Sequence, residues 1–415
     1  MGAGLSLPIF ASLGSKANAS RQDDSPAETN GRTLLVLGGT RFLGPAIVKA
    51  AKARGYEITL FNRGKSAPEM WPELETLIGD RNTHDLAALE GRKWDLVVDT
   101  SCYLPSHAKK AAEVLGPNVG HYVLISTISV YENGGDGPVV DESAPVGRVT
   151  DEQVARVTGI QDVMLDGGIY YGPLKALCEE QLEELMPGRV TSLRPGVIAG
   201  KDDPSDRLPY WVVRANQGGE ILCPGDPDQD FQYTDVNDLA EWSVDFGERG
   251  VGGIFNAIGF EAKVTLQEFL HGCKIVLGRN DATYTWASEE FLLENEVRPF
   301  SEMPFWLPVD WAHHYSTDAL IAAGATFRPI ASTIRETIDW HMEERGEAHQ
   351  WGYYGMQPAR EAELLAAWHA LQDGAEPAEP PETEPGVEGD LPEREMREMR
   401  EADSNLEEGS DRRGG

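Results

Sequence analysis

Basic residues are scarce in this chain of 415 residues, which contains 36 Lys and Arg against 69 Asp and Glu. The formal net charge is −33. The last 43 residues, 373–415, hold 15 acidic and 5 basic side chains, a net −10 that leaves −23 on the rest. Because binding to nucleic acid depends on neutralising phosphates, this balance predicts that the chain has no nucleic-acid partner.

Cysteines and long apolar runs are also few. The four cysteines lie far apart, and none forms the Cys-x-x-Cys pair typical of a metal or redox site. His341 and the pair His313–His314 lack metal-ligand neighbours at helical spacing, so no metal is expected. No internal apolar run is long enough to cross a bilayer, which predicts a chain without a membrane span.

The two ends of the chain differ in composition from its middle. Gly4–Leu13 is mostly apolar and Ala17-Asn18-Ala19 is similar to a cleavage site, but the basic region of a secretory signal is missing. Residues 1–31 are therefore either a truncated signal over the first 19 residues, which predicts an exported or periplasmic protein, or a disordered extension, which predicts a cytoplasmic one. Repeated Glu-Pro pairs predict an acidic disordered tail over residues 373–415.

The middle of the chain alternates short apolar runs with helical segments. This alternation predicts an α/β fold of Rossmann type, a doubly wound parallel sheet with right-handed crossovers. The expected strands are 33–37, 57–61, 76–78, 95–99 and 122–126, and the expected helices are 45–54, 106–115, 332–344 and 359–371. We expect a dinucleotide-binding domain over residues 32–200. A smaller substrate-binding lobe over residues 201–372 would be interleaved with it.

A glycine-rich turn follows the first expected strand directly. It consists of Gly38, Gly39, Thr40, Arg41, Phe42, Leu43 and Gly44. Glycine is needed where the backbone turns sharply and approaches a pyrophosphate that rests on a helix N-terminus. The position of the turn between a strand and a helix therefore predicts binding of a dinucleotide.

The end of the second strand normally distinguishes between the two nicotinamide cofactors. A carboxylate there would bind the adenosine ribose hydroxyls, but this chain has Asn62 and Arg63, with Arg41 nearby in the glycine turn. Two guanidinium groups favour a 2′-phosphate, so we expect NADP in preference to NAD. Asp80 and Arg81, after the third strand, are expected at the adenine edge, although Asp80 is equally suited to capping a turn.

Tyr171 and Lys175 stand four residues apart in the segment Tyr-Gly-Pro-Leu-Lys. A phenol has an ordinary pKa of about 10, and a cation on the next helical turn favours its ionised form. Such a tyrosine can exchange a proton with a substrate oxygen while a nicotinamide exchanges hydride with the attached carbon. Tyr170 does not have this spacing from Lys175.

Five segments together resemble the extended, atypical short-chain dehydrogenase/reductases of the NAD-dependent epimerase/dehydratase family, over roughly residues 33–345. They are the glycine turn 38–44, Ser-Thr-Ile-Ser-Val-Tyr at 126–131, Tyr-Gly-Pro-Leu-Lys at 171–175, Leu-Arg-Pro-Gly at 193–196 and Tyr-Thr-Asp-Val-Asn-Asp-Leu-Ala at 233–240. The resemblance implies that Thr127 hydrogen-bonds the reacting oxygen, Tyr171 is the acid/base, and Lys175 holds the nicotinamide ribose and lowers the pKa of the phenol. It also implies a possible homodimer.

Two departures limit the activity that the resemblance implies. Arg41 replaces the second glycine of the usual extended pattern, and Ile128 and Ser129 replace the Asp-Glu pair that follows the catalytic Thr of the 4,6-dehydratases. Elimination of water is therefore not expected. The activity that we expect is that of an epimerase or reductase, which acts on a hydroxyl or ketone of a sugar or sugar nucleotide.

The second lobe should bind the small-molecule substrate. Arg207, Tyr210 and Arg214 follow a polar loop and are our candidates for contacts with it. A different class of function stays open, because chloroplast stem-loop-binding relatives share a similar Gly-Gly-Thr-Arg-Phe turn. On that alternative the chain would be a catalytically silent, RNA- or protein-associated binding protein that still binds a dinucleotide.

Overall fold

The computed structural model describes residues 31–374, apart from 136–138, 158, 164–167 and 309–313. The signal-like segment, except for its last residue, and the acidic tail beyond residue 374 lie outside the described part. His313 lies outside it as well.

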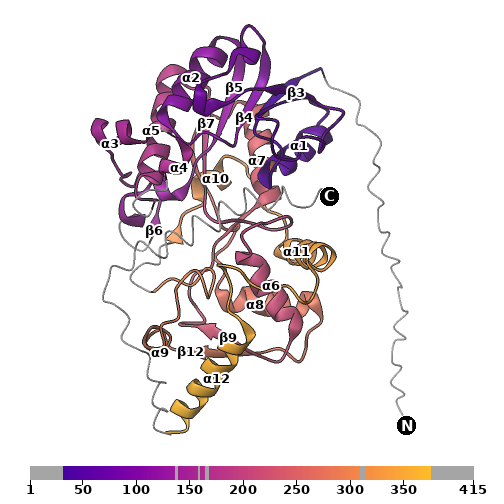
Figure 1. Ribbon diagram of the computed structural model, residues 1–415, viewed down its shortest axis with the longest axis vertical. Coiled ribbons are helices and arrows are strands. Elements are labelled where there is room, and N and C mark those ends of the chain that lie inside the picture. The colour runs from indigo at the N-terminus through magenta and orange to yellow at the C-terminus, as the bar shows by residue number, and fades with distance from the viewer. Residues whose placement is uncertain (1–30, 136–138, 158, 164–167, 309–313, 375–415) are drawn as a thin grey trace, which may run out of the picture.

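A parallel sheet of seven strands forms the upper half of the molecule (Figure 1). In spatial order the strands are β11 (Gly253–Ala257), β7 (Val190–Pro195), β5 (Val119–Ile125), β4 (Trp94–Asp99), β1 (Thr33–Leu37), β2 (Glu57–Asn62) and β3 (Glu75–Ile78). All six neighbouring pairs are parallel. The predicted α/β fold with a doubly wound parallel sheet is confirmed, and the predicted strands agree with the observed ones to within a few residues.

Helices cover both faces of this sheet, as parallel strands require. One face packs against α1 (Leu43–Ala53) and α7 (Val236–Arg249), and the other against α2 (Pro105–Leu115) and α5 (Tyr171–Leu185). Leu34–Leu37 of β1 are fully buried, because the strand contacts a hydrophobic layer on each side. This double burial explains why the strands are continuous apolar runs in the sequence.

A second lobe with its own core forms the lower half of Figure 1. Its main elements are α6 (Arg207–Gln217), β9 (Glu220–Pro224), α8 (Leu266–Leu277), β12 (Thr283–Ala287), α9 (Glu289–Glu294), α11 (Ile330–Glu344) and α12 (Pro358–Gln372). Trp211, Phe231, Phe269 and Trp306 are almost completely buried at its centre. The domain limits drawn from the sequence stay a prediction.

The two halves are interleaved in the sequence, and α7 makes hydrogen bonds that connect them. Asp235 caps the N-terminus of α7 by accepting hydrogen bonds from two backbone amides, and it also accepts one from the Thr333 hydroxyl of α11 at 2.6 Å. The carboxylate of Asp238 accepts the backbone N–H of Arg328. These contacts fix a helix of the sheet layer against a helix of the second lobe.

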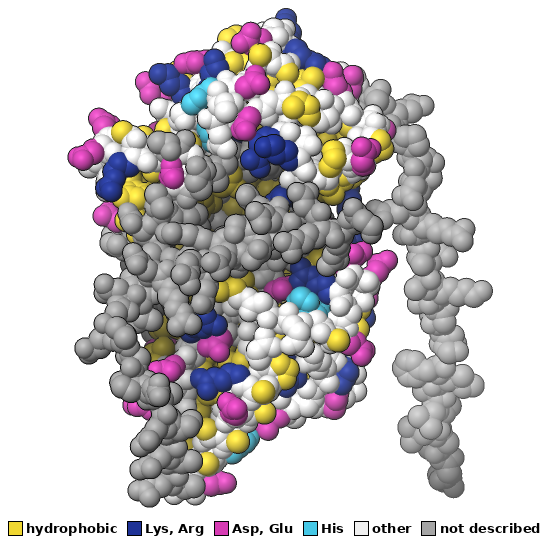
Figure 2. All heavy atoms as spheres, in the orientation of Figure 1, with side chains coloured by type: hydrophobic (Ala, Val, Ile, Leu, Met, Phe, Trp, Pro, Cys, Tyr) yellow, Lys and Arg dark blue, Asp and Glu magenta, His cyan; other side chains and the backbone are white. Residues whose placement is uncertain are grey.

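Shorter elements connect these parts. They are β6 (Val139–Val140), α3 (Asp151–Arg156), α4 (Ile160–Val163), β8 (Ile198–Ala199), β10 (Thr234–Asp235), β13 (His314–Tyr315) and α10 (Asp318–Ala322). In the described part of the chain, no helix is both long and apolar enough to cross a membrane. All four cysteines are buried free thiols. Acidic and basic side chains are intermixed on both lobes of the face shown in Figure 2.

Candidate active site

Two adjoining cavities lie at the carboxyl ends of the parallel strands, where ligands of open α/β sheets bind. The first has a volume of about 450 Å³ and runs along the ends of β1 to β5. Its lining contains almost every residue that the sequence predicted for the cofactor and the chemistry: Gly38, Gly39, Thr40, Arg41, Phe42, Leu43, Asn62, Arg63, Asp80, Arg81, Thr127, Tyr171 and Lys175. Gly44 is the one residue predicted for the cofactor or the chemistry that lies outside this lining.

The glycine turn shapes one wall of the first cavity. Gly38 and Gly39 have φ angles of 121° and 99°, a region in which other residues are strained. A Cβ on Gly44 would lie 2.5 Å from the Cα of Gly39, so this glycine lets α1 approach the turn closely. The first turn of α1 therefore borders the cavity, where its backbone amides suit a pyrophosphate. These features fit a dinucleotide.

The far end of this cavity has the polar groups expected for an adenosine. The side-chain oxygen of Asn62 accepts the backbone N–H of Gly64 at 2.7 Å and shapes the turn after β2. Its Nδ2 is buried and has no hydrogen-bond partner among the described residues, so it is suited to a ligand. Arg41 and Arg63 are exposed at the rim, and Lys65 lines the same cavity.

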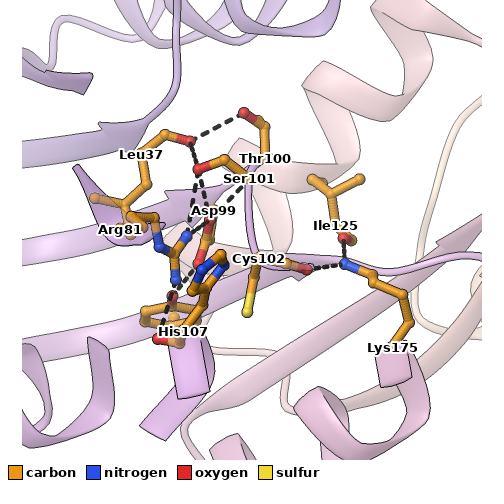
Figure 3. A network of polar contacts seen from close by, with 10 residues as sticks. Leu37, Arg81, Asp99, Thr100, Ser101, Cys102, His107, Ile125 and Lys175 are labelled. Atoms are coloured by element: carbon orange, nitrogen blue, oxygen red, sulfur yellow. Dashed lines mark hydrogen bonds and ion pairs between the residues drawn. The ribbon is translucent and has the colours of Figure 1, made fainter. Parts of the chain in front are cut away.

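Asp80 and Arg81 line the first cavity, and both also make contacts that hold the surrounding backbone. Asp80 caps a short 3₁₀ turn, Arg81–Thr83, by accepting the backbone N–H of Asn82 at 3.0 Å. Arg81 is only 8% exposed and pairs with Asp99 at 2.5 Å, and it also donates to the carbonyl oxygen of His107 (Figure 3). Contact of either residue with an adenine stays a prediction.

The Arg81–Asp99 pair holds the loop after β4 in place. Asp99 is fully buried at the end of β4, and its second carboxylate oxygen accepts the hydroxyl of Tyr122. Burial raises the pKa of Asp99, but the Arg81 guanidinium more than offsets this and the pKa is lowered. The same carboxylate accepts the backbone N–H of Ser101 at 3.0 Å (Figure 3). The loop that leads to Tyr103 is thereby fixed along the cavity.

Lys175 is almost fully buried beneath the cavity, on α5 one turn after Tyr171. Its Nζ donates hydrogen bonds of 2.6 Å to the carbonyl oxygens of Cys102 and Ile125 (Figure 3). It also lies 5.7 Å from the centre of the Tyr103 ring. The ammonium is thus anchored between the ends of β4 and β5, with its charge directed at backbone oxygens.

Tyr171 begins helix α5 and is half-buried. Burial raises the pKa of Tyr171, a hydrogen bond with the Thr127 side chain lowers it, and the nearby Cys178 raises it. The net effect is an increase, and Lys175 is not among its causes. Lowering of this pKa by Lys175 stays a prediction, and the ammonium itself is bound to two carbonyl oxygens.

The second cavity, of about 570 Å³, opens between the sheet and the second lobe. Thr127 and Tyr171 line both cavities, so the phenol lies where they meet. Arg207 lines the second cavity as predicted. Its guanidinium lies 5.1 Å from the ring centre of Tyr354 and donates to the Ser205 hydroxyl at 2.9 Å.

The structure does not bring Tyr210 and Arg214 to either of these cavities. Tyr210 is 1% exposed and packs between Trp211 and Trp351 in the core of the second lobe. Arg214 pairs with Glu361 of α12 at 2.7 Å. The prediction that these two contact the substrate is corrected, because the buried face of α6 turns both toward the core.

Several cavity residues were not predicted from the sequence. Tyr103 lies 6.4 Å from Tyr171, ring centre to ring centre, and Ser129 accepts a hydrogen bond from the Thr127 hydroxyl at 3.1 Å. Asp203 and Asp230 border the second cavity. Ser129 follows Thr127 closely enough to have been found, and Asp203 lies in the polar loop before Arg207, whereas Tyr103 and Asp230 come from loops without a pattern.

No metal centre is evident in the described ranges, where no group of three or more His, Cys, Asp or Glu side chains gathers. No protein-family model matches the chain. Over 304 residues, 68% of its length, the chain is 26% identical to the chloroplast stem-loop binding protein of 41 kDa b from Arabidopsis thaliana, and it covers 74% of that protein.

Epimerases are among the solved structures that match. The UDP-N-acetylglucosamine 4-epimerase of Bacillus cereus superposes with a TM-score of 0.54 at 17% identity, over 75% of this chain and 99% of that one. The UDP-glucuronic acid 4-epimerase of the same organism, solved with NAD, gives 0.52 at 14% identity, over 75% and 99%. The predicted resemblance to the extended short-chain dehydrogenase/reductases is thus confirmed at the level of the fold.

Proposed function

We propose that this protein is an NAD(P)-dependent oxidoreductase or epimerase that acts at a hydroxyl or ketone carbon of a sugar-like substrate. One observation carries the proposal: Tyr171 and Thr127 border both the cavity suited to a dinucleotide and the cavity beside it. A proton donor at such a boundary can reach a substrate oxygen in one cavity and a nicotinamide in the other.

The residues that would hold a dinucleotide form one continuous wall. The glycine turn and the N-terminus of α1 suit the pyrophosphate, and the turn after β2 suits the adenosine. When bound, the nicotinamide would accept or return hydride, and its oxidised form would bring a positive charge near the phenol. Lys175 and Tyr103 border the end of the cavity where Tyr171 lies.

Tyr171 is the proton carrier in this proposal. Because its pKa is raised, the phenol is protonated at neutral pH and is ready to donate to a carbonyl oxygen during reduction. In the reverse direction its phenolate form takes the proton from the substrate hydroxyl. Thr127 would donate a hydrogen bond to the same oxygen, for which its single hydroxyl hydrogen has to turn away from Ser129, its acceptor in the structure.

Three cations support the choice of NADP over NAD. Arg41, in the turn after β1, and Arg63 and Lys65, after β2, line the first cavity, and Asp80 is the one acidic side chain among the described residues that line it. A 2′-phosphate would gain bidentate contacts from the guanidinium groups. The structural neighbour solved with NAD shows that the fold also accepts the unphosphorylated cofactor.

Epimerisation and ketone reduction fit the site better than elimination of water. Ile128 and Ser129, which follow Thr127, line the second cavity and offer neither an acid nor a base of carboxylate type. One acid/base and one hydride carrier are sufficient for the first two reactions. We therefore assign no dehydratase activity.

Titration of the purified protein with NADPH, followed by the fluorescence of the nicotinamide, tests the proposal. We expect saturable binding in the micromolar range and weaker binding of NADH. A lack of binding by both cofactors at millimolar concentration would contradict the proposed function. The intact mass of the same sample would show whether residues 1–19 are removed, which separates an exported from a cytoplasmic protein.

A second candidate function is a binding protein that keeps the fold without turnover. The 26% identity to a stem-loop binding protein favours it. The net charge of −33 opposes contact with RNA, because there are few cations to neutralise phosphates. A filter-binding assay with structured RNA at low salt decides between them, since tight and salt-sensitive binding would support this alternative.

A further inference from the structure

The charged groups of the second cavity differ from those that a nucleotide would require. Among the described residues that line it, Asp203 and Asp230 are acidic and Arg207 alone is basic. Asp203 and Arg207 lie four residues apart, in the loop before α6 and at its start, and Asp230 comes from the segment before β10. The cavity thus has two carboxyls for one guanidinium.

Each carboxylate has one oxygen that is bound and one that is not. Asp203 is 1% exposed, and its Oδ1 accepts the backbone N–H and the hydroxyl of Ser205, at 2.8 and 2.6 Å. Asp230 uses Oδ2 to pair with Nδ1 of His314. The remaining oxygens, Oδ2 of Asp203 and Oδ1 of Asp230, are buried and have no hydrogen-bond partner among the described residues.

A buried carboxylate oxygen without a donor is costly, and a ligand that supplies a donor removes this cost. Hydroxyl groups are such donors, whereas phosphate groups at neutral pH are almost entirely acceptors. A pyrophosphate near Asp203 and Asp230 would add repulsion between like charges in a partly desolvated site. The two free oxygens therefore select for hydroxyl groups.

Arg207 offers little compensation for a pyrophosphate. Its Nε is engaged by the Ser205 hydroxyl, and its guanidinium packs near the rings of Phe300 and Tyr354, at 5.9 and 5.1 Å. Burial raises the pKa of Asp203, and the nearby Arg207 guanidinium offsets part of this rise, so part of its positive charge is already matched. A single cation in this setting is a weak partner for two phosphate groups.

The remaining lining suits the ring of a free sugar. Phe300, Phe305 and Tyr315 present aromatic surface that can pack against the C–H groups of a pyranose. Gln232 is held against the backbone of Tyr315 by hydrogen bonds of 2.9 Å in both directions. Aromatic surface with a few fixed polar groups is the usual lining of a small-molecule pocket.

We propose that the second cavity binds an uncharged polyhydroxyl substrate, a free monosaccharide or its polyol, with hydroxyl groups donating to Asp203 and Asp230, rather than a sugar nucleotide. This inference rests on the proposed function, because it names the substrate class of the same site. It places the reacting carbon beside Tyr171, which lines this cavity.

The test uses the full-length protein saturated with NADP⁺. Saturation-transfer NMR and calorimetric titration measure binding of free aldopentoses, aldohexoses and their alditols, with UDP and UDP-glucose in parallel. We expect saturable binding of at least one free sugar or alditol, and binding of UDP and UDP-glucose that is at least about tenfold weaker. Tighter binding of UDP-glucose than of every free sugar and alditol would overturn the proposal, and so would a lack of saturable binding across the free sugars and alditols.

Variants at the two carboxylates add a readout at the level of single residues. Asp203→Asn and Asp230→Asn should each weaken sugar binding roughly tenfold while leaving the affinity for NADPH unchanged. Asp230→Asn keeps the test valid if the more buried Asp203→Asn does not fold. Asp202→Asn and Asp228→Asn remove the same charge from exposed neighbours that do not line the cavity, and should leave sugar binding unchanged.

Failure of this inference can be distinguished from failure of the proposed function. Cofactor binding is measured on the same samples by NADPH fluorescence. Tight cofactor binding together with a preference for UDP-glucose contradicts only the substrate class. Absence of cofactor binding contradicts the proposed function itself.

Discussion

The Nζ of Lys175 donates a 2.6 Å hydrogen bond to the carbonyl oxygen of Ile125, the last residue of β5. The ammonium is therefore bound at the carboxyl end of the strands, and it also donates to a second carbonyl, that of Cys102 in the loop after β4. The lysine joins the N-terminal part of α5 to two strand ends, which places Tyr171 relative to both cavities. The protein's own hydrogen bonds therefore give Lys175 a positioning role.

Lys175→Met should both destabilise the protein and weaken cofactor binding. The change leaves two buried carbonyl oxygens without their donor, which costs about 1–3 kcal/mol of the free energy of unfolding. Denaturant titration and NADPH titration measure the two effects. Lys109→Met, an exposed position on α2, is the matched control and should change stability by less than about 0.5 kcal/mol.

Tyr171→Phe removes the proposed proton carrier and keeps the ring. We expect kcat to fall by roughly 10²–10⁴-fold with the affinity for NADPH retained, because general acid–base catalysis contributes about that much. Steady-state kinetics with the substrate and a separate NADPH titration measure the two quantities. Tyr170→Phe changes the adjacent phenol, which lines neither cavity although Tyr171 packs against the same hydrophobic cluster, and should keep most of the activity. If the variant at 170 is the inactive one, the assignment of Tyr171 is wrong.

Arg41→Ala and Arg63→Ala should shift cofactor preference. Each removes a cation from the rim of the first cavity, and loss of a charge-assisted contact to the 2′-phosphate should raise the Kd for NADPH by about tenfold or more. The Kd for NADH should change little. Arg92→Ala is the control, since this arginine pairs with Glu75 outside the cavity. Equal losses for both cofactors would argue against a phosphate site.

Gly44→Ala should be poorly tolerated although alanine favours helix. The added Cβ would lie 2.5 Å from the Cα of Gly39, so α1 must move away from the turn. We expect a loss of about 1–3 kcal/mol in stability and a large loss in NADPH affinity. Gly272→Ala in α8 is the control, because its Cβ would meet only Ile334 at 3.8 Å. That variant should gain about 0.5–1 kcal/mol.

His341 should make the protein acid-sensitive. Its side chain is fully buried without hydrogen-bond partners among the described residues, and burial, followed by the nearby His349, lowers its pKa to about 4. Below its ordinary pKa of 6.5 the unfolded chain binds a proton that the folded chain does not accept until about pH 4. The contribution of neutral His341 to the stability of the folded state is therefore fully present above pH 6.5, and it is lost as the pH falls to 4.

The contribution of His341 over this pH window is on the order of 3 kcal/mol. Denaturant titrations at several pH values between 4 and 7 measure it. His341→Phe should flatten the dependence of stability on pH, whereas His271→Phe, at an exposed position, should leave the wild-type slope. An unchanged slope in His341→Phe would show that other groups cause the acid sensitivity.

Local patterns were sufficient to predict most of the sheet half. The strand that ends at Leu37 and the turn at Gly38 were both found, because apolar runs and glycine turns are properties of neighbouring residues. The same holds for Tyr171 and Lys175, which share one face of a helix by their spacing. These features depend on contacts within a few residues or on burial of a whole strand.

The substrate side could not be predicted in the same way. Tyr210 and Arg214 lie in a polar and aromatic segment, yet α6 turns them into the core and against α12. Asp203 and Asp230 are separated by 27 positions in the sequence and meet the same cavity because two loops converge there. Which side chain of a loop faces a cavity depends on packing between distant elements.

The amino-acid order alone therefore determined that a parallel sheet forms, that a glycine turn follows its first strand, and that a phenol and an ammonium stand one helical turn apart. The tertiary structure decided that the ammonium binds carbonyl oxygens and that burial raises the pKa of the phenol. It also decided which carboxylates reach the second cavity. The physical reason is that desolvation and long-range pairing arise only when segments distant in the chain pack together.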